Sequence, residues 1–433
     1  MRVFLQALGC RLNEAERERW TRDCRAHGFR LAADAAQADL VVINTCAVTA
    51  ESVRKSRQLV RRAQRANPRA KLVVSGCYAS LAAADIGAEL GVDLVVSNQE
   101  KDRLIPLVAE RLDLPVMPAI ATRPGEHALP GHGRHRAFVK VQDGCRYRCA
   151  FCIVTKARGE ERSRPVTEII EEINALQAGG VQEAVLAGVH LGGYRSDSGG
   201  SLGNLVHAVL AETSIPRLRL GSLEPWELAP DFWSLFDDPR LLPHLHLPIQ
   251  SGANSVLRRM SRRCRSDEFR GLVTQARQAV PGMNITTDII VGFPGETDAE
   301  WQETLDLAAD MGFGDIHIFA YSPRAGTKAA AMPDQVAHEV KRARSGQLHD
   351  LARRSRRRVL EAARGQDFEV LIEGRGEQRE GVGARWSGYT PNYLRVEIGD
   401  TRRDLDNQIV SVRADGLSDD GERLTARLLA KPA

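Results

Sequence analysis

The chain has 433 residues, of which 43% are hydrophobic, enough for two to four domains with real cores. Its 60 Lys and Arg against 56 Asp and Glu leave a net charge of +4, which by itself predicts no partner. No apolar run reaches the roughly 20 residues of a membrane span, and residues 1–6 lack a signal-peptide core. We therefore expect a cytoplasmic protein without membrane contact, in which eight Cys are better metal ligands than disulfide partners.

The first 110 residues alternate short apolar runs with amphipathic segments. This alternation predicts an α/β fold with a doubly wound parallel sheet and helices on both faces. The predicted strands are residues 3–8, 40–44, 71–75 and 93–97, and the predicted helices are residues 14–27, 50–66 and 81–90.

Three cysteines, Cys10, Cys46 and Cys77, directly follow the first three predicted strands. Ligands in open α/β sheets gather at the carboxyl ends of the strands, so these thiols could converge on one metal centre. The alternative is that they are small buried residues, since free Cys packs well in cores. Their shared topological position favours an iron–sulfur cluster. Cys24, inside a predicted helix, and Cys264, in an Arg-rich segment, lack this pattern and are interpreted as ordinary thiols.

Residues 111–135 are rich in Pro and Gly and predict a linker between two domains. Residues 136–335 then repeat strand and helix about six times, which predicts a partial (β/α)6 barrel rather than a closed eight-stranded one. The predicted strands are residues 138–141, 183–189, 217–220, 244–248, 285–291 and 315–320, with helices between them such as residues 166–178 and 267–279.

Cys145, Cys149 and Cys152 directly follow the first strand of this block at a C-x-x-x-C-x-x-C spacing. A cuboidal iron–sulfur cluster has four irons and usually four Cys ligands, so three thiolates leave one iron open. Zinc is the alternative, but a structural zinc site normally takes four ligands in paired spacing, and this loop has no nearby His or fourth Cys. We therefore predict an iron–sulfur cluster at which chemistry begins.

This spacing, with Phe151 before the last cysteine, resembles the signature of the radical S-adenosylmethionine (SAM) enzymes. The resemblance implies that the open iron binds SAM and that electron transfer cleaves it to a 5′-deoxyadenosyl radical, so the three cysteines are catalytic. Loops at the carboxyl ends of the barrel strands should hold SAM. Each candidate in these loops has an alternative role in a turn, a cap or a structural hydrogen bond. The candidates are Gly188, His190, Glu224, Gln250, Asp288 and Gly292, with Glu224 as the acceptor for the ribose.

Residues 336–365 predict a basic helical connector. Such a run is either a solvated helix face or a surface that neutralises RNA phosphates. Because it joins two domains, we favour RNA contact and predict that Arg353, Arg354 and Arg357 bind RNA.

Residues 366–433 contain short strands with polar turns, which predict a small antiparallel β-barrel. With its turn at residues 389–393, this part resembles the TRAM domain, an oligonucleotide-binding-like (OB-like) barrel of RNA-modifying enzymes. Exposed Tyr389, Tyr393 and Trp386 could stack on bases, although aromatic residues of barrels are as often core.

Residues 9–14, 44–48, 75–77, 157–159 and 163–165, with the second cysteine loop, resemble the methylthiotransferases, radical SAM enzymes with two three-cysteine clusters. This resemblance covers essentially the whole chain. It implies two [4Fe-4S] clusters and SAM in two roles, as methyl donor and as radical source. One departure is Thr155-Lys156, where many relatives have Pro-Tyr.

Three stretches, residues 9–13 with Glu16 nearby, residues 136–144 and residues 319–327, most resemble the branch that adds a methylthio group to C2 of N6-threonylcarbamoyladenosine beside the tRNA anticodon. Related branches act on isopentenyladenosine or on a ribosomal-protein aspartate, and a non-catalytic tRNA-binding metalloprotein is the alternative of another class. The implied partners are the tRNA anticodon arm and an external electron donor such as a flavodoxin or ferredoxin, and we expect a monomer.

Overall fold

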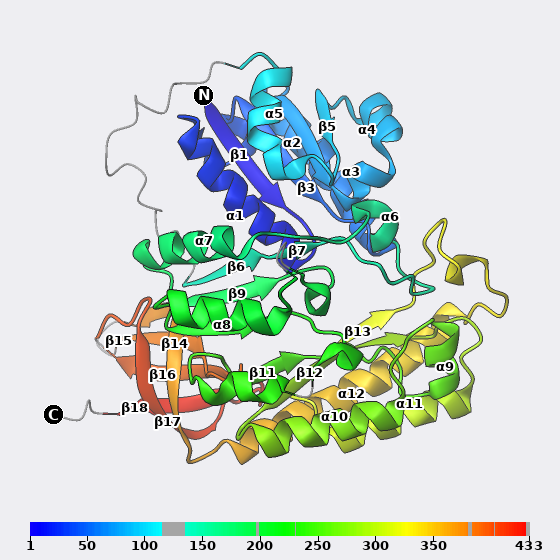
Figure 1. Cartoon of the computed structure of the whole chain (residues 1–433), viewed down its shortest axis with the longest axis vertical. Coiled ribbons are helices and arrows are strands. Elements are labelled where there is room, and N and C mark those ends of the chain that lie inside the picture. The colour runs from blue at the N-terminus through cyan, green and yellow to red at the C-terminus, as the bar shows by residue number, and fades with distance from the viewer. Residues whose placement is uncertain (115–134, 196–198, 230, 380–382, 402, 430–433) are drawn as a thin grey trace.

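The computed structural model describes residues 1–114, 135–195, 199–229, 231–379, 383–401 and 403–429 (Figure 1). An N-terminal sheet lies at the top of the view, a second set of parallel strands in the middle, and a small barrel at the lower left. Most of the predicted linker, residues 111–135, lies outside the described residues. None of the described helices is long and apolar enough to cross a membrane.

The N-terminal sheet has five parallel strands in the order β2-β1-β3-β4-β5, which confirms the predicted parallel sheet. Strand β2 was not predicted, because two exposed residues carry no apolar alternation. The strands are β1 (Arg2–Ala7), β2 (Arg30–Leu31), β3 (Leu40–Thr45), β4 (Lys71–Gly76) and β5 (Leu94–Val96).

Helices cover both faces of this sheet, as a doubly wound fold requires. Because alternate residues of β3 point to opposite faces, Val41 and Ile43 pack in the core under α2 and α4, whereas Leu40 and Val42 pack under α1 and α5. Thr49 caps α2 by accepting from the Ser52 backbone N–H at 3.0 Å. The helices are α1 (Arg11–Ala26), α2 (Ala50–Ala66), α3 (Cys77–Leu81), α4 (Ala83–Leu90) and α5 (Leu104–Arg111).

Six parallel strands follow one another in chain order across the middle of the molecule and form the predicted partial barrel. Bridges from Leu218 to Leu241 and from Ser222 to His246 join its two three-stranded halves. The strands are β6 (Arg136–Lys140), β9 (Glu183–Ala187), β10 (Arg217–Leu220), β11 (His244–His246), β12 (Asn284–Val291) and β13 (Asp315–Ala320).

Helices on the outside of these strands bury the largest hydrophobic core among the described residues. They are α7 (Val166–Ala178), α8 (Leu202–Glu212), α9 (Asn254–Arg259), α10 (Ser266–Ala279) and α11 (Asp298–Met311). A short hairpin and helix beside the second cysteine loop were not predicted: β7 (Gln142–Asp143), α6 (Val154–Arg158) and β8 (Arg162–Ser163). Short 3-10 turns are η1 (Ala35–Gln37), η2 (Lys101–Arg103), η4 (Leu191–Gly193), η5 (Pro225–Glu227), η6 (Phe232–Asp237) and η7 (Ala329–Ala331).

The predicted basic helix is α12 (His338–Ala362), which packs against β13 and α11. Two of its arginines pair with acidic side chains of the central domain. Buried Arg344 pairs with Glu296 at 2.8 Å, and Arg356 pairs with Asp315 at 2.5 Å. Part of the positive charge therefore holds the helix on the central domain and does not face solvent.

Five strands close the C-terminal barrel in the order β14-β15-β16-β18-β17. All neighbours are antiparallel except β16 and β18, which pair in parallel. The strands are β14 (Asp367–Arg379), β15 (Gly383–Tyr389), β16 (Arg395–Thr401), β17 (Ile409–Leu417) and β18 (Leu424–Leu428). The prediction that Trp386 is exposed is wrong: its side chain lies in the barrel core, opposite Ile398 of β16, and is 2% exposed.

Candidate active site

The loop after β6 brings Cys145, Cys149 and Cys152 together. Gly144 starts it with a φ of +75°, and any Cβ there would lie 1.9 Å from the backbone oxygen of Glu160, so only glycine fits. Burial, and then the negative charges of Cys152 and Cys149, raise the pKa of Cys145 to about 12. Three thiols whose ionised forms repel one another suit a cationic iron cluster, which binds thiolates.

Two N–H groups face the sulfurs of this loop. The Val154 backbone donates to Cys152 Sγ at 3.4 Å, and Arg262 Nη1 lies 3.9 Å from Cys149 Sγ. Hydrogen bonds to cysteine sulfurs are one of the means by which a protein tunes the reduction potential of a cluster. Arg262 also holds the carboxylate of Glu224, at 2.7 and 3.2 Å.

Cys10, Cys46 and Cys77 meet at the carboxyl edge of the N-terminal sheet, as their positions after β1, β3 and β4 predict. Burial, and then the negative charges of Cys10 and Cys77, raise the pKa of Cys46. Gly9 has a φ of +111°, and a Cβ there would lie 2.7 Å from Cys46 Sγ. Cys10 is exposed, whereas the other two are buried, so the trio has an open side.

The remaining cysteines lie apart from both trios. Cys24 belongs to the hydrophobic core under α1, and Cys264 belongs to the core of the central domain. Burial raises the pKa of both thiols, that of Cys264 to about 12. Their surroundings agree with the prediction that they are ordinary thiols.

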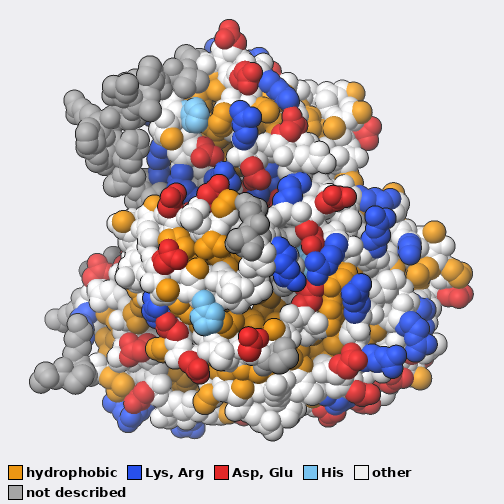
Figure 2. Space-filling model, viewed as in Figure 1, with side chains coloured by type: hydrophobic (Ala, Val, Ile, Leu, Met, Phe, Trp, Pro, Cys, Tyr) orange, Lys and Arg blue, Asp and Glu red, His pale blue; other side chains and the backbone are white. Residues whose placement is uncertain are grey.

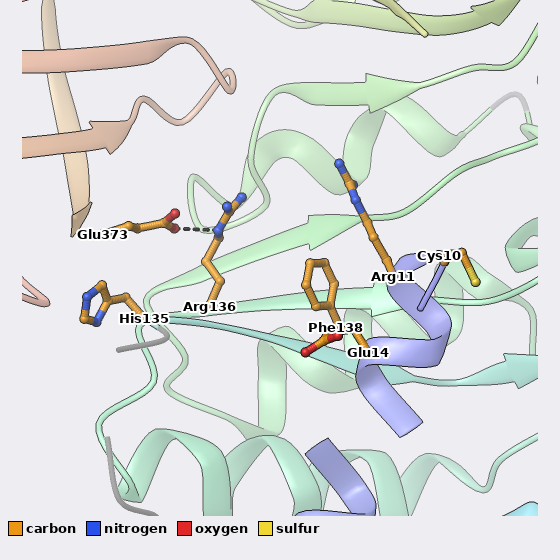
Figure 3. Close-up of a pocket in the computed structure, with 8 residues that line it drawn as sticks. Cys10, Arg11, Glu14, His135, Arg136, Phe138 and Glu373 are labelled. Carbon is orange, nitrogen blue, oxygen red and sulfur yellow. Dashed lines mark ion pairs between the residues drawn. The ribbon is translucent and has the colours of Figure 1, made fainter. Parts of the chain in front are cut away.

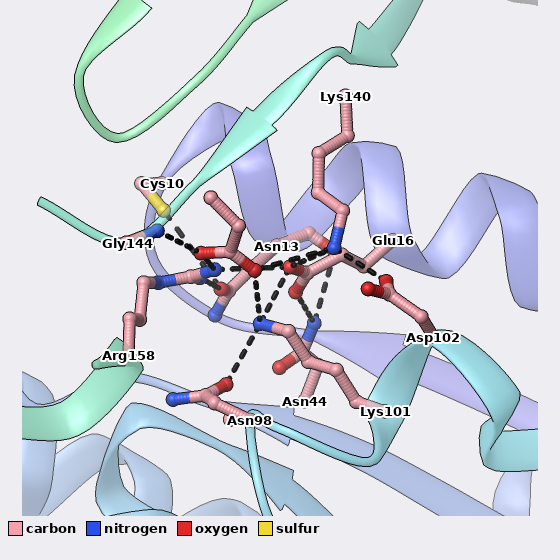
Figure 4. A network of polar contacts seen from close by, with 12 residues as sticks. Cys10, Asn13, Glu16, Asn44, Asn98, Lys101, Asp102, Lys140, Gly144 and Arg158 are labelled. Carbon is pink, nitrogen blue, oxygen red and sulfur yellow. Dashed lines mark hydrogen bonds and ion pairs between the residues drawn. The ribbon is translucent and has the colours of Figure 1, made fainter. Parts of the chain in front are cut away.

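A buried polar network joins the two cysteine loops (Figure 4). Arg158, at the end of α6, donates to Asp143 at 2.9 Å and to Asn13 at 2.8 Å. The Asp143 carboxylate in turn accepts from the backbone N–H of Gly144 at 2.8 Å, and Gly144 is the residue directly before Cys145. One guanidinium therefore connects the second cysteine loop to the first turn of α1.

Asn13 fixes the other end of this connection. Its amide donates to the backbone oxygens of Leu8 at 2.7 Å and of Thr45 at 3.1 Å. The amide of Asn44 donates to Glu16 at 2.9 Å. These bonds hold the turns after β1 and β3, which carry two of the N-terminal cysteines, on the same network as the second loop.

Buried opposite charges stabilise the network. Lys101, with no exposed side-chain surface, lies 2.5 Å from Glu16, and Lys140 lies 3.2 Å from Asp143. Burial alone would raise the pKa of Glu16, but the positive charges of Lys101, Arg158 and Lys140 lower it to about 2. The same three cations lower the pKa of Asp143, against the effect of its burial. Both carboxylates are therefore ionised at neutral pH.

The predicted SAM positions at β9 lie close to the second cysteine loop. Cys145, Glu161 and His190 place ligand atoms within 4.8 Å of one another. The ring of His190 contacts Glu161 at 2.5 Å and also Glu227, and these carboxylates raise its pKa against the effect of burial. A Cβ at Gly188 would lie 3.0 Å from the side chain of Gln142, so this turn passes close to its neighbour.

The other predicted SAM positions have partners within the fold. Gln250, with a φ of +77°, donates its backbone N–H to the Asp288 backbone oxygen at 2.9 Å. The Asp288 carboxylate lies 3.1 Å from His246, and the Gly292 N–H donates to Glu296 at 2.9 Å. Gln250 and Gly292 follow the ends of β11 and β12, whereas Asp288 lies within β12, and contact of all three with SAM stays a prediction.

The predicted RNA positions divide into two groups. Arg353, Arg354 and Arg357 are exposed on α12. Tyr389 and Tyr393 are only half-buried rather than freely exposed: their rings stack at 4.7 Å, and Arg136 of β6 lies 4.8 and 5.3 Å from their centres. The tyrosines therefore belong to the contact between the barrel and the central domain.

Sequence patterns did not identify Arg158, Glu16 or Lys101 as site residues, because charged residues on amphipathic helices normally face solvent. The signals were the resemblance of residues 157–159 to a family motif and of residues 9–13 with Glu16 to one branch of the family. In Figure 2, Lys and Arg side chains interspersed with Asp and Glu cross the middle of the face, between the N-terminal sheet and the central strands.

Comparison with known proteins agrees with this geometry. Residues 2–97 match the family described as uncharacterized protein family UPF0004, and residues 139–308 match the radical SAM superfamily. The chain is 35% identical to the threonylcarbamoyladenosine tRNA methylthiotransferase MtaB of Bacillus subtilis, over 95% of this chain and 93% of that one. It is 34% identical to the MtaB of Thermotoga maritima, over 97% and 95%.

Two further similarities are informative. The chain is 36% identical to the tRNA-2-methylthio-N(6)-dimethylallyladenosine synthase of Cereibacter sphaeroides, over 87% of this chain and 88% of that one. Among solved structures, the radical SAM methyltransferase TsrM of Kitasatospora setae is similar with a TM-score of 0.56, 16% identity and coverage of 76% and 77%. At that identity the similarity concerns the fold alone.

Proposed function

The chain belongs to the methylthiotransferase family of radical SAM enzymes, and on that basis we propose that it adds a methylthio group to C2 of N6-threonylcarbamoyladenosine beside the anticodon of tRNA. The observation that carries the proposal is the pair of cysteine trios held together by one buried network. Acid–base groups alone would not accomplish this reaction, because the C2–H of a purine is not an acidic proton.

The cofactors are SAM and two [4Fe-4S] clusters. When bound, SAM supplies the radical and the methyl group, and the open iron of the N-terminal cluster would hold the sulfur that is methylated. Cys145, Cys149 and Cys152 would hold the cluster that binds SAM. The other trio would hold the cluster at which sulfur is transferred. Its open side at Cys10 would admit the substrate base, and the network around Arg158 fixes the two loops relative to each other. Gly188, His190, Glu224, Gln250, Asp288 and Gly292 would surround SAM.

The similarity along the chain favours the threonylcarbamoyl substrate over isopentenyladenosine. Three threonylcarbamoyladenosine relatives align over 95–97% of this chain, whereas a fourth, from Aquifex aeolicus, aligns over 86% and the dimethylallyl relative over 87%. The similarity along the chain is to tRNA methylthiotransferases, so a ribosomal-protein substrate and a non-catalytic metalloprotein are not favoured.

We also propose a single-chain enzyme in the cytoplasm that takes electrons from a flavodoxin or ferredoxin. One chain supports both trios and the network between them, so the site needs no residue from a second copy.

The decisive test is mass spectrometry of nucleosides from the tRNA of cells that lack this chain. We expect 2-methylthio-N6-threonylcarbamoyladenosine to disappear and the unthiolated nucleoside to accumulate, with recovery on re-expression of the chain. Loss of the methylthio group from isopentenyladenosine instead would identify the other branch, and unchanged nucleosides would refute the proposal.

The exposed arginines of α12 are proposed to bind the tRNA backbone. Arg353 and Arg357 have only exposed partners on the same helix, Asp350 and Glu361. Exposed ion pairs of this kind are worth little, so a phosphate can replace them. Arg354 makes no hydrogen bond or ion pair within the described residues. Tyr389 and Tyr393 stack on each other in the contact between the barrel and the central domain, so we propose that they contact RNA only through the exposed edges of their rings.

Changing the three exposed α12 arginines to Gln should weaken tRNA binding. The magnitude of the slope of log affinity against log salt concentration should also fall by about two to three, because each lost phosphate contact removes roughly 0.7–0.9 from it. Fluorescence anisotropy at several salt concentrations measures both. The control changes three exposed arginines of α2: Arg61, Arg62 and Arg65. Equal losses in the two triple variants would show that only net charge matters and would contradict a binding surface on α12.

A further inference from the structure

A cavity of about 370 Å³ lies beside Cys10, between α1, β6 and β14 (Figure 3). Cys10 and Arg11 form part of its wall on one side, and Arg136 and Phe138 of β6 line it on another. Glu373 of the barrel contributes from the third side. The cavity therefore adjoins the exposed cysteine of the N-terminal trio at the meeting point of all three parts of the chain.

The charges that line this cavity are not balanced. Arg136 pairs with Glu373 at 2.5 Å, and Glu14 pairs with Arg17 at 2.6 Å. Arg11 has no such partner: within the described residues its guanidinium makes neither a hydrogen bond nor an ion pair. One positive charge next to Cys10 thus remains available to an anion.

Aromatic rings hold this free cation in place. The Arg11 guanidinium carbon lies 5.9 Å from the ring centre of Phe138 and 5.9 Å from that of Tyr393. Figure 3 shows the side chain extending from the start of α1 past Phe138. A guanidinium over aromatic faces keeps its N–H donors free at its edge, so Arg11 is positioned to bind a planar anion.

Arg219 adds a second positive charge beside the Tyr393 ring. Arg219 is completely buried, 4.7 Å from the Tyr393 ring, and its Nη1 has no hydrogen-bond partner. Its Nε is bound to Glu183 at 2.7 Å. Burial alone would raise the pKa of the Tyr393 hydroxyl, but the positive charges of Arg136 and Arg11 outweigh burial and lower the pKa below its usual value. The electrostatic potential around this ring is therefore positive.

We propose that Arg11 binds the carboxylate of the threonylcarbamoyl group and thereby selects this base over one with an uncharged N6 substituent. The proposal rests on the proposed function. Arg11 directly follows Cys10, so their Cα atoms are about 3.8 Å apart. In adenine, C2 and the carbon that bears N6 both adjoin N1 of the six-membered ring. A base whose C2 faces the N-terminal trio would therefore direct its N6 substituent into the cavity beside Cys10.

An RNA phosphate is the other anion that Arg11 could bind, and the experiment separates the two. Anaerobically reconstituted enzyme is titrated with an anticodon stem-loop that carries N6-threonylcarbamoyladenosine, and with the same stem-loop in which the carboxylate is converted to a methylamide. Anisotropy gives both affinities for the wild type, Arg11→Gln, Arg11→Lys and the control Arg30→Gln, which changes an exposed arginine on the edge strand β2.

The wild type and Arg30→Gln should bind the acid about tenfold more tightly than the amide, because a charge-assisted bond to a carboxylate is lost in the amide. Arg11→Gln should bind both stem-loops with the affinity of the wild type for the amide, and Arg11→Lys should keep part of the preference. Since Arg11 is exposed, circular dichroism and iron content should be unchanged.

Two results would overturn the inference. A tenfold preference that persists in Arg11→Gln would place the carboxylate elsewhere, and an equal loss of affinity for acid and amide would assign Arg11 to a phosphate. Product formation on the acid stem-loop is scored separately. If the wild type forms no methylthio product, the proposed function fails while the binding comparison still decides the role of Arg11.

Discussion

Changing Cys145, Cys149 and Cys152 together to Ala is expected to abolish reductive cleavage of SAM and, with it, all methylthio product. Changing Cys10, Cys46 and Cys77 is expected to leave that cleavage intact and to remove only the product. The difference follows from the structure, because each trio is built on its own loops and its thiols converge on a separate point.

These outcomes are measured as 5′-deoxyadenosine and methylthio nucleoside released by anaerobically reconstituted protein. The wild type should bind about eight irons and each triple variant about four, since each cluster holds four. The control Cys264→Ala changes a thiol in the hydrophobic core and should keep all eight. Product from the Cys10, Cys46 and Cys77 variant would refute its role in sulfur transfer, and stoichiometric zinc without cleavage would refute the enzyme.

Changing Arg158 to Gln should destabilise the folded chain by about 3–5 kcal/mol, the usual effect of removing one partner from a buried ion pair. The side chain is 2% exposed and lies 3.0 Å from Glu16 and 2.9 Å from Asp143. Without it, two buried carboxylates lose a counter-charge and Asn13 loses a donor. The connection between the two cysteine loops is lost at the same time.

Two measurements separate the structural role of Arg158 from its positioning role. Urea unfolding of the metal-free protein, followed by circular dichroism, gives the change in stability. The ratio of methylthio product to 5′-deoxyadenosine measures how often SAM cleavage leads to product. This ratio should fall in the variant if the network positions the two cysteine loops. The control Arg57→Gln removes a surface pair with Glu89 and should change stability by less than about 1 kcal/mol. An unchanged ratio would limit Arg158 to stability.

Much of the fold followed from local pattern. Apolar runs bounded by polar turns predicted β3, β4 and the six central strands within a few residues. Both cysteine trios were also predictable, one from its close spacing and one because Cys10, Cys46 and Cys77 each follow a strand of one parallel sheet. Each of these predictions depends on a pattern among residues close together in the sequence or on the rule that parallel strands end at one edge of a sheet.

Other features depended on which elements meet in space. Trp386 is core because β15 turns that face into the barrel. Tyr393 lies against Arg11, Arg136 and Arg219, residues contributed by the N-terminal and central parts of the chain. No local pattern of the sequence marks such a contact, since it arises only when the barrel docks on the central strands.

The amino-acid sequence by itself determined the α/β architecture, the two sets of three thiols and the family chemistry they imply. Only the tertiary structure decided that Arg158, Glu16 and Lys101 are buried together, and that Arg11 stays unpaired beside Cys10 among the described residues. The physical reason is that periodicity reports how a segment folds, whereas the burial and pairing of a charge depend on groups that tertiary packing brings from distant parts of the chain.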